Sequence, residues 1–146
     1  MTHMIDAITH SSIYVLDQDE ALEFYVGKLG LEVATDADMG IMRWLTVHVP
    51  GRPGRELLLE KPGPPSLDDD TVQQVRELVR KHAMPVVIFT TPDCRATYDE
   101  LVAKGVQFTQ EPIKRFYGTD CALRDPFGNN LRITQPAPEP FEVPVG

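Results

Sequence analysis

The sequence predicts an α+β protein made of two similar halves, each with the order strand, helix, strand, strand, strand. Each half has a helix that begins at an aspartate, ends at a glycine and follows an alternating strand. Asp17 lies 76 residues before Asp93, and Gly30 lies 75 residues before Gly105. Because both features keep nearly one offset, we infer an internal duplication. Eight strands with helices confined to one face are typical of the α+β class.

The first half opens with a strand at residues 8–16, where apolar and polar side chains alternate. One face of this strand carries His10, Ser12 and Tyr14. Asp17 caps the helix that follows, and Glu20 stands three residues later at the spacing of a capping box. Gly30 supplies the left-handed conformation that ends the helix. Three strands complete the half, at residues 31–33, 43–49 and 56–60.

The second half repeats this pattern. A strand at residues 86–91 precedes a helix that Asp93 caps and Gly105 ends. Its remaining strands are predicted at residues 106–108, 120–124 and 130–134. The Asp-Pro-Phe-Gly-Asn segment at residues 125–129 is interpreted as a structural turn, because Pro and Gly set its backbone and Asp bonds back to it.

A proline-rich linker at residues 62–65 and a third helix at about 68–82 lie between the halves. Acidic residues begin this helix and basic residues end it, which matches the helix dipole. We expect it to cover the fold; a lid over a pocket is the alternative. The predicted organisation is a single domain with a first module at about 5–61, a linker and helix at about 62–83, a second module at about 84–135, and an extended tail at 136–146.

Composition and charge narrow the classes of partner. The 146 residues carry 14 Lys and Arg against 22 Asp and Glu, a net charge of −8. Such a surface repels nucleic acid and anionic lipid and attracts cationic small molecules. No apolar run approaches the length of a bilayer span, and residues 1–6 do not resemble a signal peptide. Cys94 and Cys121 form no disulfide framework, so we expect a cytoplasmic protein.

Several of these features together resemble the vicinal oxygen chelate superfamily. They are His10 followed seven residues later by Asp17, Ala-Leu-Glu-Phe-Tyr at 21–25, Leu-Gly-Leu at 29–31, and the turn at 125–129. The superfamily includes glyoxalase I, extradiol dioxygenases, fosfomycin-modifying enzymes and bleomycin-resistance proteins. The resemblance implies paired βαβββ modules whose sheets curl around a cavity, usually within a homodimer. Because this scaffold hosts many chemistries, the resemblance leaves the reaction unassigned.

Superfamily enzymes hold a metal in the cavity with ligands from the first and last strands of each module. Carried onto this chain, the first position is His10, which matches. The equivalent position in the second module is Val86, which has no donor atom, and the last strand offers Arg132, whose charge repels a divalent cation. A catalytic metal normally has about three protein ligands. We therefore expect no metal cofactor.

The last strand of the first module leaves its register open. Counting back from the following proline puts Leu58 at the ligand position, whereas matching the Glu-Leu pair puts Glu56 there. Glu60 shares their face. His48 is a further conceivable ligand, and His10 with Glu56 would hold a divalent metal if one binds. The favoured interpretation of His10 is a pocket-wall residue bonded to a neighbour, with ligand or general base as the alternative.

The predicted ligand-binding residues are His10, Ser12, Tyr14, Trp44, Glu56, Glu60, Tyr117 and Arg132. The aromatic members would stack on a flat or cationic ligand, or else form core. Arg132 either clamps an anionic group of the ligand or pairs with one of the two glutamates. No cysteine or serine has a nucleophile's sequence context, so a hydrolase is disfavoured.

These residues predict a small-molecule-binding protein with an incomplete metal site. One alternative is a drug-sequestering protein similar to bleomycin-resistance proteins, and the other is a metal-dependent lyase or dioxygenase.

Overall fold

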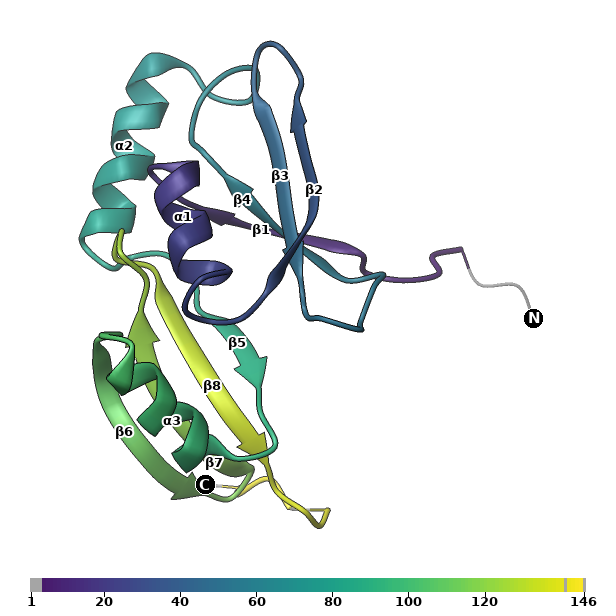
Figure 1. Ribbon diagram of the computed structural model, residues 1–146, viewed down its shortest axis with the longest axis vertical. Coiled ribbons are helices and arrows are strands. Elements are labelled where there is room, and N and C mark those ends of the chain that lie inside the picture. The colour runs from purple at the N-terminus through teal and green to yellow at the C-terminus, as the bar shows by residue number, and fades with distance from the viewer. Residues whose placement is uncertain (1–3, 141, 146) are drawn as a thin grey trace. The chain divides into compact units, whose positions relative to one another are not determined.

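The computed structural model in Figure 1 describes residues 4–140 and 142–145. The chain divides into two compact units, Met1–Glu77 and Leu78–Gly146. Each unit contains one mixed sheet of four strands, and the two sheets have the same topology. The α+β class and the two-module arrangement are confirmed. Along the described chain, no helix has the length and apolar character needed to cross a bilayer.

In unit 1, β1 (His10–Tyr14) pairs in parallel with β4 (Glu56–Glu60). β3 (Arg43–His48) is antiparallel to β4 and to β2 (Glu32–Asp38), which gives the order β1-β4-β3-β2. α1 (Gln18–Tyr25) packs against β4 and covers one side of the sheet (Figure 1). The predicted cap is confirmed, because Asp17 Oδ1 accepts a hydrogen bond from the Glu20 amide at 2.8 Å.

Alternation along the strands separates a core face from an open face. The core face carries the buried side chains of Ile13, Val15, Leu45, Val47 and Leu59, which pack with Ala21, Phe24 and Tyr25 of α1. Gln18 lies among them, and its amide nitrogen donates to the carbonyl oxygens of Leu59 and Arg43 at 2.9 and 3.1 Å. The open face carries the residues that alternate with this core, including His10, Ser12 and Tyr14.

In unit 2, β5 (Val87–Thr90) pairs in parallel with β8 (Asn130–Pro136). β7 (Gly118–Arg124) is antiparallel to β8 and to β6 (Phe108–Arg115), so the order is β5-β8-β7-β6. α3 (Cys94–Ala103) contacts β6, β7 and β8 along one side of the sheet (Figure 1). Asp93 Oδ1 caps α3 by accepting from the Ala96 amide at 3.0 Å.

Several strand boundaries differ from the sequence prediction. β2 and β6 are longer than predicted, because each forms a ribbon with the strand that follows it. The tail predicted to start at Pro136 is also corrected, since β8 includes this residue opposite Gly118. β5 ends at Thr90, opposite Thr134, so Pro136 has a neighbour on one side only. A proline is tolerated there because its missing N–H faces no partner strand.

The third helix, α2, spans Asp69–Arg80. Just past its end, His82 has a positive φ of 66°, and its Nδ1 lies 2.9 Å from the carbonyl oxygen of Gly128. Gly128 belongs to the predicted turn at residues 125–129. The structural role of this turn is confirmed, because Asp125 Oδ1 accepts from the amides of residues 127, 128 and 129.

The two cysteines lie in the core of unit 2. Cys94 and Cys121 are both free and fully buried, with their Sγ atoms 3.6 Å apart. Burial raises the pKa of the Cys94 thiol and raises that of Cys121 to about 12. Both groups therefore remain protonated at neutral pH, which suits packing and not nucleophilic attack.

We predict that both thiols resist a disulfide reagent in the folded protein. At pH 8, reaction with dithiobis(nitrobenzoate) is expected to be at least ~100-fold slower than in denaturant, because thiolate and access both require unfolding. The same sample in concentrated guanidinium is the control and should release two equivalents of chromophore, one per cysteine. Fast reaction of either cysteine in the native protein would contradict the packing described.

Candidate functional site

The open face of the unit 1 sheet brings together six of the eight predicted residues. Strand pairing sets His10 beside Glu56 and Tyr14 beside Glu60. Between these pairs, Ser12 lies beside Leu58. The row continues onto β3, where Thr46 pairs with Leu58. Trp44 stands two residues from Thr46 on the same face.

His10, Glu56 and Trp44 form the centre of this cluster. His10 Nε2 lies 3.6 Å from Glu56 Oε1, an ion-pair distance when the imidazole is protonated. The imidazole and indole ring centroids are 6.0 Å apart, with the planes inclined by 52°. The His10 side chain is 42% exposed and that of Glu56 is 23% exposed. Both are therefore open to a ligand, and His10 Nδ1 is 2.9 Å from Thr9 Oγ1.

Thr46 belongs to the cluster, although the sequence prediction did not include it. Its hydroxyl donates to Glu56 Oε1 at 2.6 Å, and the residue is fully buried. This bond fixes the carboxylate that faces His10. A threonine within a strand carries no functional signal in a sequence, and its partner is ten residues away. Only the pairing of β3 with β4 could have revealed the contact.

Two further polar pairs lie on the same face, one on each side of the cluster formed by His10, Glu56 and Trp44. At one end, burial and the charge of Glu60 raise the pKa of the Tyr14 hydroxyl. At the other end, His48 Nε2 lies 3.3 Å from Glu32 Oε1. The Nδ1 atom of His48 is buried and meets no hydrogen-bond partner within the described residues. The open face of unit 1 thus presents carboxylates, imidazoles and aromatic rings.

The remaining two predicted residues lie on the open face of unit 2, the side of that sheet away from α3. Arg132 on β8 donates from Nη1 to Asp120 Oδ2 at 2.5 Å. Tyr117 donates its hydroxyl to the same oxygen at 3.0 Å. The sequence leaves open whether Arg132 binds an anion or pairs with Glu56 or Glu60. Its partner is Asp120, a residue that the sequence prediction did not include.

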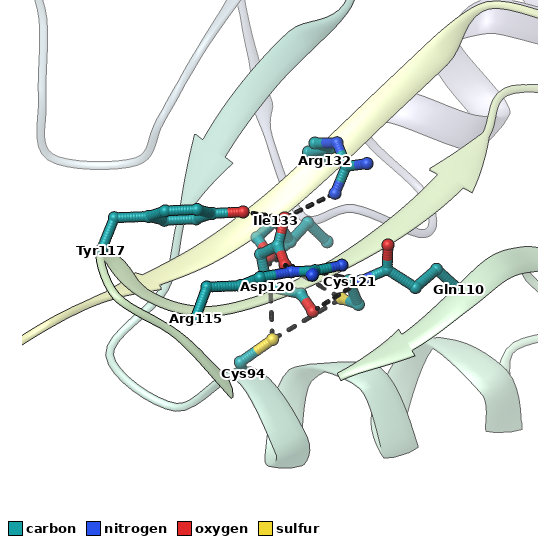
Figure 2. A network of polar contacts seen from close by, with 8 residues as sticks. All are labelled: Cys94, Gln110, Arg115, Tyr117, Asp120, Cys121, Arg132 and Ile133. Atoms are coloured by element: carbon teal, nitrogen blue, oxygen red, sulfur yellow. Dashed lines mark hydrogen bonds and ion pairs between the residues drawn. The ribbon is translucent and has the colours of Figure 1, made fainter. Parts of the chain in front are cut away.

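Asp120 is the centre of the network of polar contacts in Figure 2. Its side chain is only 1% exposed, whereas those of Arg132 and Arg115 are 37% and 44% exposed. Arg115 Nε lies 3.7 Å from Asp120 Oδ1, and the Gln110 amide approaches that oxygen at 3.4 Å. Figure 2 shows Arg132 on one side of the sheet and the sulfur atoms of Cys94 and Cys121 on the other.

The donor set does not fit a catalytic metal. Strand pairing sets Leu58 level with Ser12 and Arg132 level with Ile88, so Leu58 and Arg132 occupy corresponding positions of the two sheets. Leu58 has no donor atom, and Glu56 is level with His10. Within the described part of the chain, no three His, Cys, Asp or Glu side chains gather in a way that could hold a metal ion. His10 and Glu56 supply two donors, and a catalytic site needs about three.

A cleft of about 510 Å³ lies elsewhere in unit 1. It runs beside the β2–β3 turn and includes Gln18, Asp36, Arg43 and Lys61, but none of the eight predicted residues. Arg43 bonds Asp36 and Asp19 of α1, which places this part of the cleft on the core side of the sheet. The cleft is therefore distinct from the open face.

The chain resembles known proteins over nearly its whole length. The model of the Glyoxalase/Bleomycin resistance protein/Dioxygenase superfamily matches residues 7–133. The protein YurT of Bacillus subtilis (strain 168) is 37% identical over 129 residues, which are 88% of this chain and 98% of YurT.

Two solved structures show the same fold. That of UcmS2 is 42% identical with a TM-score of 0.85, covering 90% of this chain and 99% of UcmS2. That of TnmS3, an antibiotic binding protein from Streptomyces sp. CB03234, is 24% identical with a TM-score of 0.75 and covers 93% of this chain and all of TnmS3. The two-module fold, the superfamily match over residues 7–133 and the similarity to YurT agree with one another. The chain belongs to the Glyoxalase/Bleomycin resistance protein/Dioxygenase superfamily.

Proposed function

We propose that this protein binds a small organic molecule without a metal cofactor, and that the open face of unit 1 contacts it. The observation that carries the proposal is the pair of neighbouring rings, His10 and Trp44, beside the oriented carboxylate of Glu56. Aromatic side chains supply large contact area, and a few fixed polar groups set the orientation of a ligand. This combination is the usual content of a small-molecule site.

The donor chemistry supports binding over metal-dependent catalysis. A metal acts in such sites as a Lewis acid, and that role requires a ligand set that His10 and Glu56 alone do not complete. The fold itself is compatible with ligand capture, since TnmS3 is an antibiotic binding protein with this fold. Sequestration of a drug is therefore the form of binding to test first.

The chain's single tryptophan, Trp44, offers a direct test. Tryptophan emission and melting temperature are followed while a library of polycyclic natural products, with bleomycin among them, is added to chelator-treated protein. We expect at least one compound to quench Trp44 and raise the melting temperature with a micromolar Kd. A compound concentration of ~1 mM detects binding with Kd values up to the millimolar range. If no member of the library changes either signal at this concentration, the proposal is wrong.

A matched pair of variants locates the site. Trp44 and Tyr98 are both half-buried aromatic residues, but Tyr98 lies on α3, on the other side of its sheet. Calorimetry should show that Trp44→Leu weakens binding of the same compound at least ~10-fold, since contact with one large ring is worth more than 1 kcal/mol at a binding centre. Tyr98→Leu should bind as the native protein does. Equal binding by both variants would overturn the placement on unit 1.

The same proposal includes a cytoplasmic homodimer. Superfamily members usually form homodimers, and both units expose large apolar side chains, among them Ile41 and Val102. Sedimentation equilibrium should give twice the chain mass of 16.4 kDa at micromolar concentration. A single species at the chain mass would contradict this part of the proposal.

A further inference from the structure

The open face of unit 2 carries an excess of positive charge in a chain whose net charge is −8. β7 alternates so that Asp120 and Arg124 point away from α3, and Arg132 and Arg115 contact Asp120 on that face. Two arginines thus contact one aspartate, and Arg124 lies on the same face, where its Nε donates to Asn130 Oδ1. Because Asp120 is buried behind the guanidinium groups, a molecule arriving at this face meets the arginines and not the carboxylate.

Arg132 is held in place by one hydrogen bond, and its other N–H donors are available to a ligand. Its Nη1 bonds Asp120, and within the described residues no acceptor meets its Nε or Nη2. A guanidinium has five N–H donors in a fixed fork that matches a carboxylate or sulfonate. Asp120 is itself fixed by Tyr117 and Gln110, so Arg132 is oriented before any ligand arrives. Such preorganisation lowers the entropic cost of binding.

Apolar groups lie directly beside this arginine. Ile88 pairs with Arg132 across the β5–β8 ladder and is 59% exposed. On its other side Arg132 pairs with Ala122. Phe116, also exposed, packs edge-on against Tyr117 with ring centroids 5.1 Å apart. An anion held by Arg132 would therefore have its organic body in contact with apolar side chains.

We infer that unit 2 recognises an amphipathic organic anion, with its carboxylate or sulfonate on Arg132 and its apolar body on Ile88. This inference rests on the proposed binding function and specifies the ligand class. It differs from the expectation drawn from the net charge, which favours cations. The local arrangement decides the preference because short-range hydrogen-bonded charge acts within a few ångströms, whereas the diffuse charge of the surface is screened by salt.

Two dyes that share one ring system and differ in a sulfonate group test the inference. 8-Anilinonaphthalene-1-sulfonate carries a sulfonate, and N-phenyl-1-naphthylamine has the same rings without it. We expect the native protein to bind the sulfonate at least ~10-fold more tightly, and benzoate to displace it where benzamide does not. Arg132→Gln should abolish the preference. Arg95→Gln, which removes the same charge on the side of α3, should keep it.

Each outcome has a distinct meaning. Equal binding of the two dyes by the native protein, or an unchanged preference in Arg132→Gln, would overturn the inference and leave the proposed function standing. Failure of both dyes to bind at ~1 mM would also overturn it, while the natural-product screen on Trp44 decides the proposed function independently. If Arg132→Gln does not fold, displacement by benzoate but not benzamide in the native protein decides the question without a variant.

Discussion

Replacing Gly118 by alanine is expected to cost at least about 3 kcal/mol of unfolding free energy, because backbone strain and a steric clash add at this position. Gly118 begins β7 opposite Pro136, with a φ of +141° that side chains rarely tolerate. A β-carbon there would meet the carbonyl oxygen of Gln135 at 2.0 Å and the amide of Ala137 at 2.9 Å. These are backbone atoms of β8 and of the residue that follows it, so they cannot turn aside as a side chain would.

Urea denaturation followed by circular dichroism measures this loss. Gly40→Ala is the matched control, since Gly40 also has a positive φ, +84°, but its β-carbon would meet nothing within 4 Å. That variant should lose only the conformational penalty, about 1–2 kcal/mol. Equal losses in the two variants would show that the Gly118 contact is not as close as described.

Replacing Asp120 by alanine is expected to destabilise the protein by about 3 kcal/mol, because it leaves the half-buried Tyr117 hydroxyl and two arginines without their acceptor. Tyr117, Gln110 and Arg132 all donate to this carboxylate. Partial exposure of Arg132 lets water solvate it after the change, which keeps the loss at the lower end of the range for buried pairs.

A double variant and a control make this result specific. Adding Arg132→Met to Asp120→Ala should recover part of the loss, since the unpaired cation is then removed as well. Asp36→Ala also removes an aspartate that pairs with an arginine, Arg43, but Asp36 is exposed. Its loss should stay below about 1 kcal/mol, as for other surface ion pairs. A loss of that size for Asp120→Ala would contradict the buried network.

The fold could be predicted from the sequence because its signals are local. The Asp17 and Asp93 caps and the glycine ends at Gly30 and Gly105 act within a few residues, and their common offset indicated two modules. Both caps and both positive φ values are present in the structure. Strand lengths were less predictable, because β2 and β6 extend as far as their partner strands allow.

The candidate site was only partly predictable, because its contacts cross between strands. His10, Trp44 and Glu56 were identified from side-chain type and alternation, and the structure places them together. Asp120 was missed, because its role depends on an ion pair with Arg132, twelve residues later, and the sequence alone does not show that these two side chains meet. The choice between Leu58 and Glu56 at the ligand position depended on register, which hydrophobic alternation alone leaves open by two residues.

The central claim is that this member of the superfamily binds its ligand without a metal ion. Calorimetric titration of chelator-treated protein with Zn²⁺, Mn²⁺, Fe²⁺ and Ni²⁺, combined with elemental analysis of protein purified without chelator, tests it most directly. We predict no stoichiometric ion and no binding at micromolar concentration. One equivalent of a transition metal, lost in both His10→Ala and Glu56→Gln, would contradict the claim and favour a metal-dependent lyase or dioxygenase.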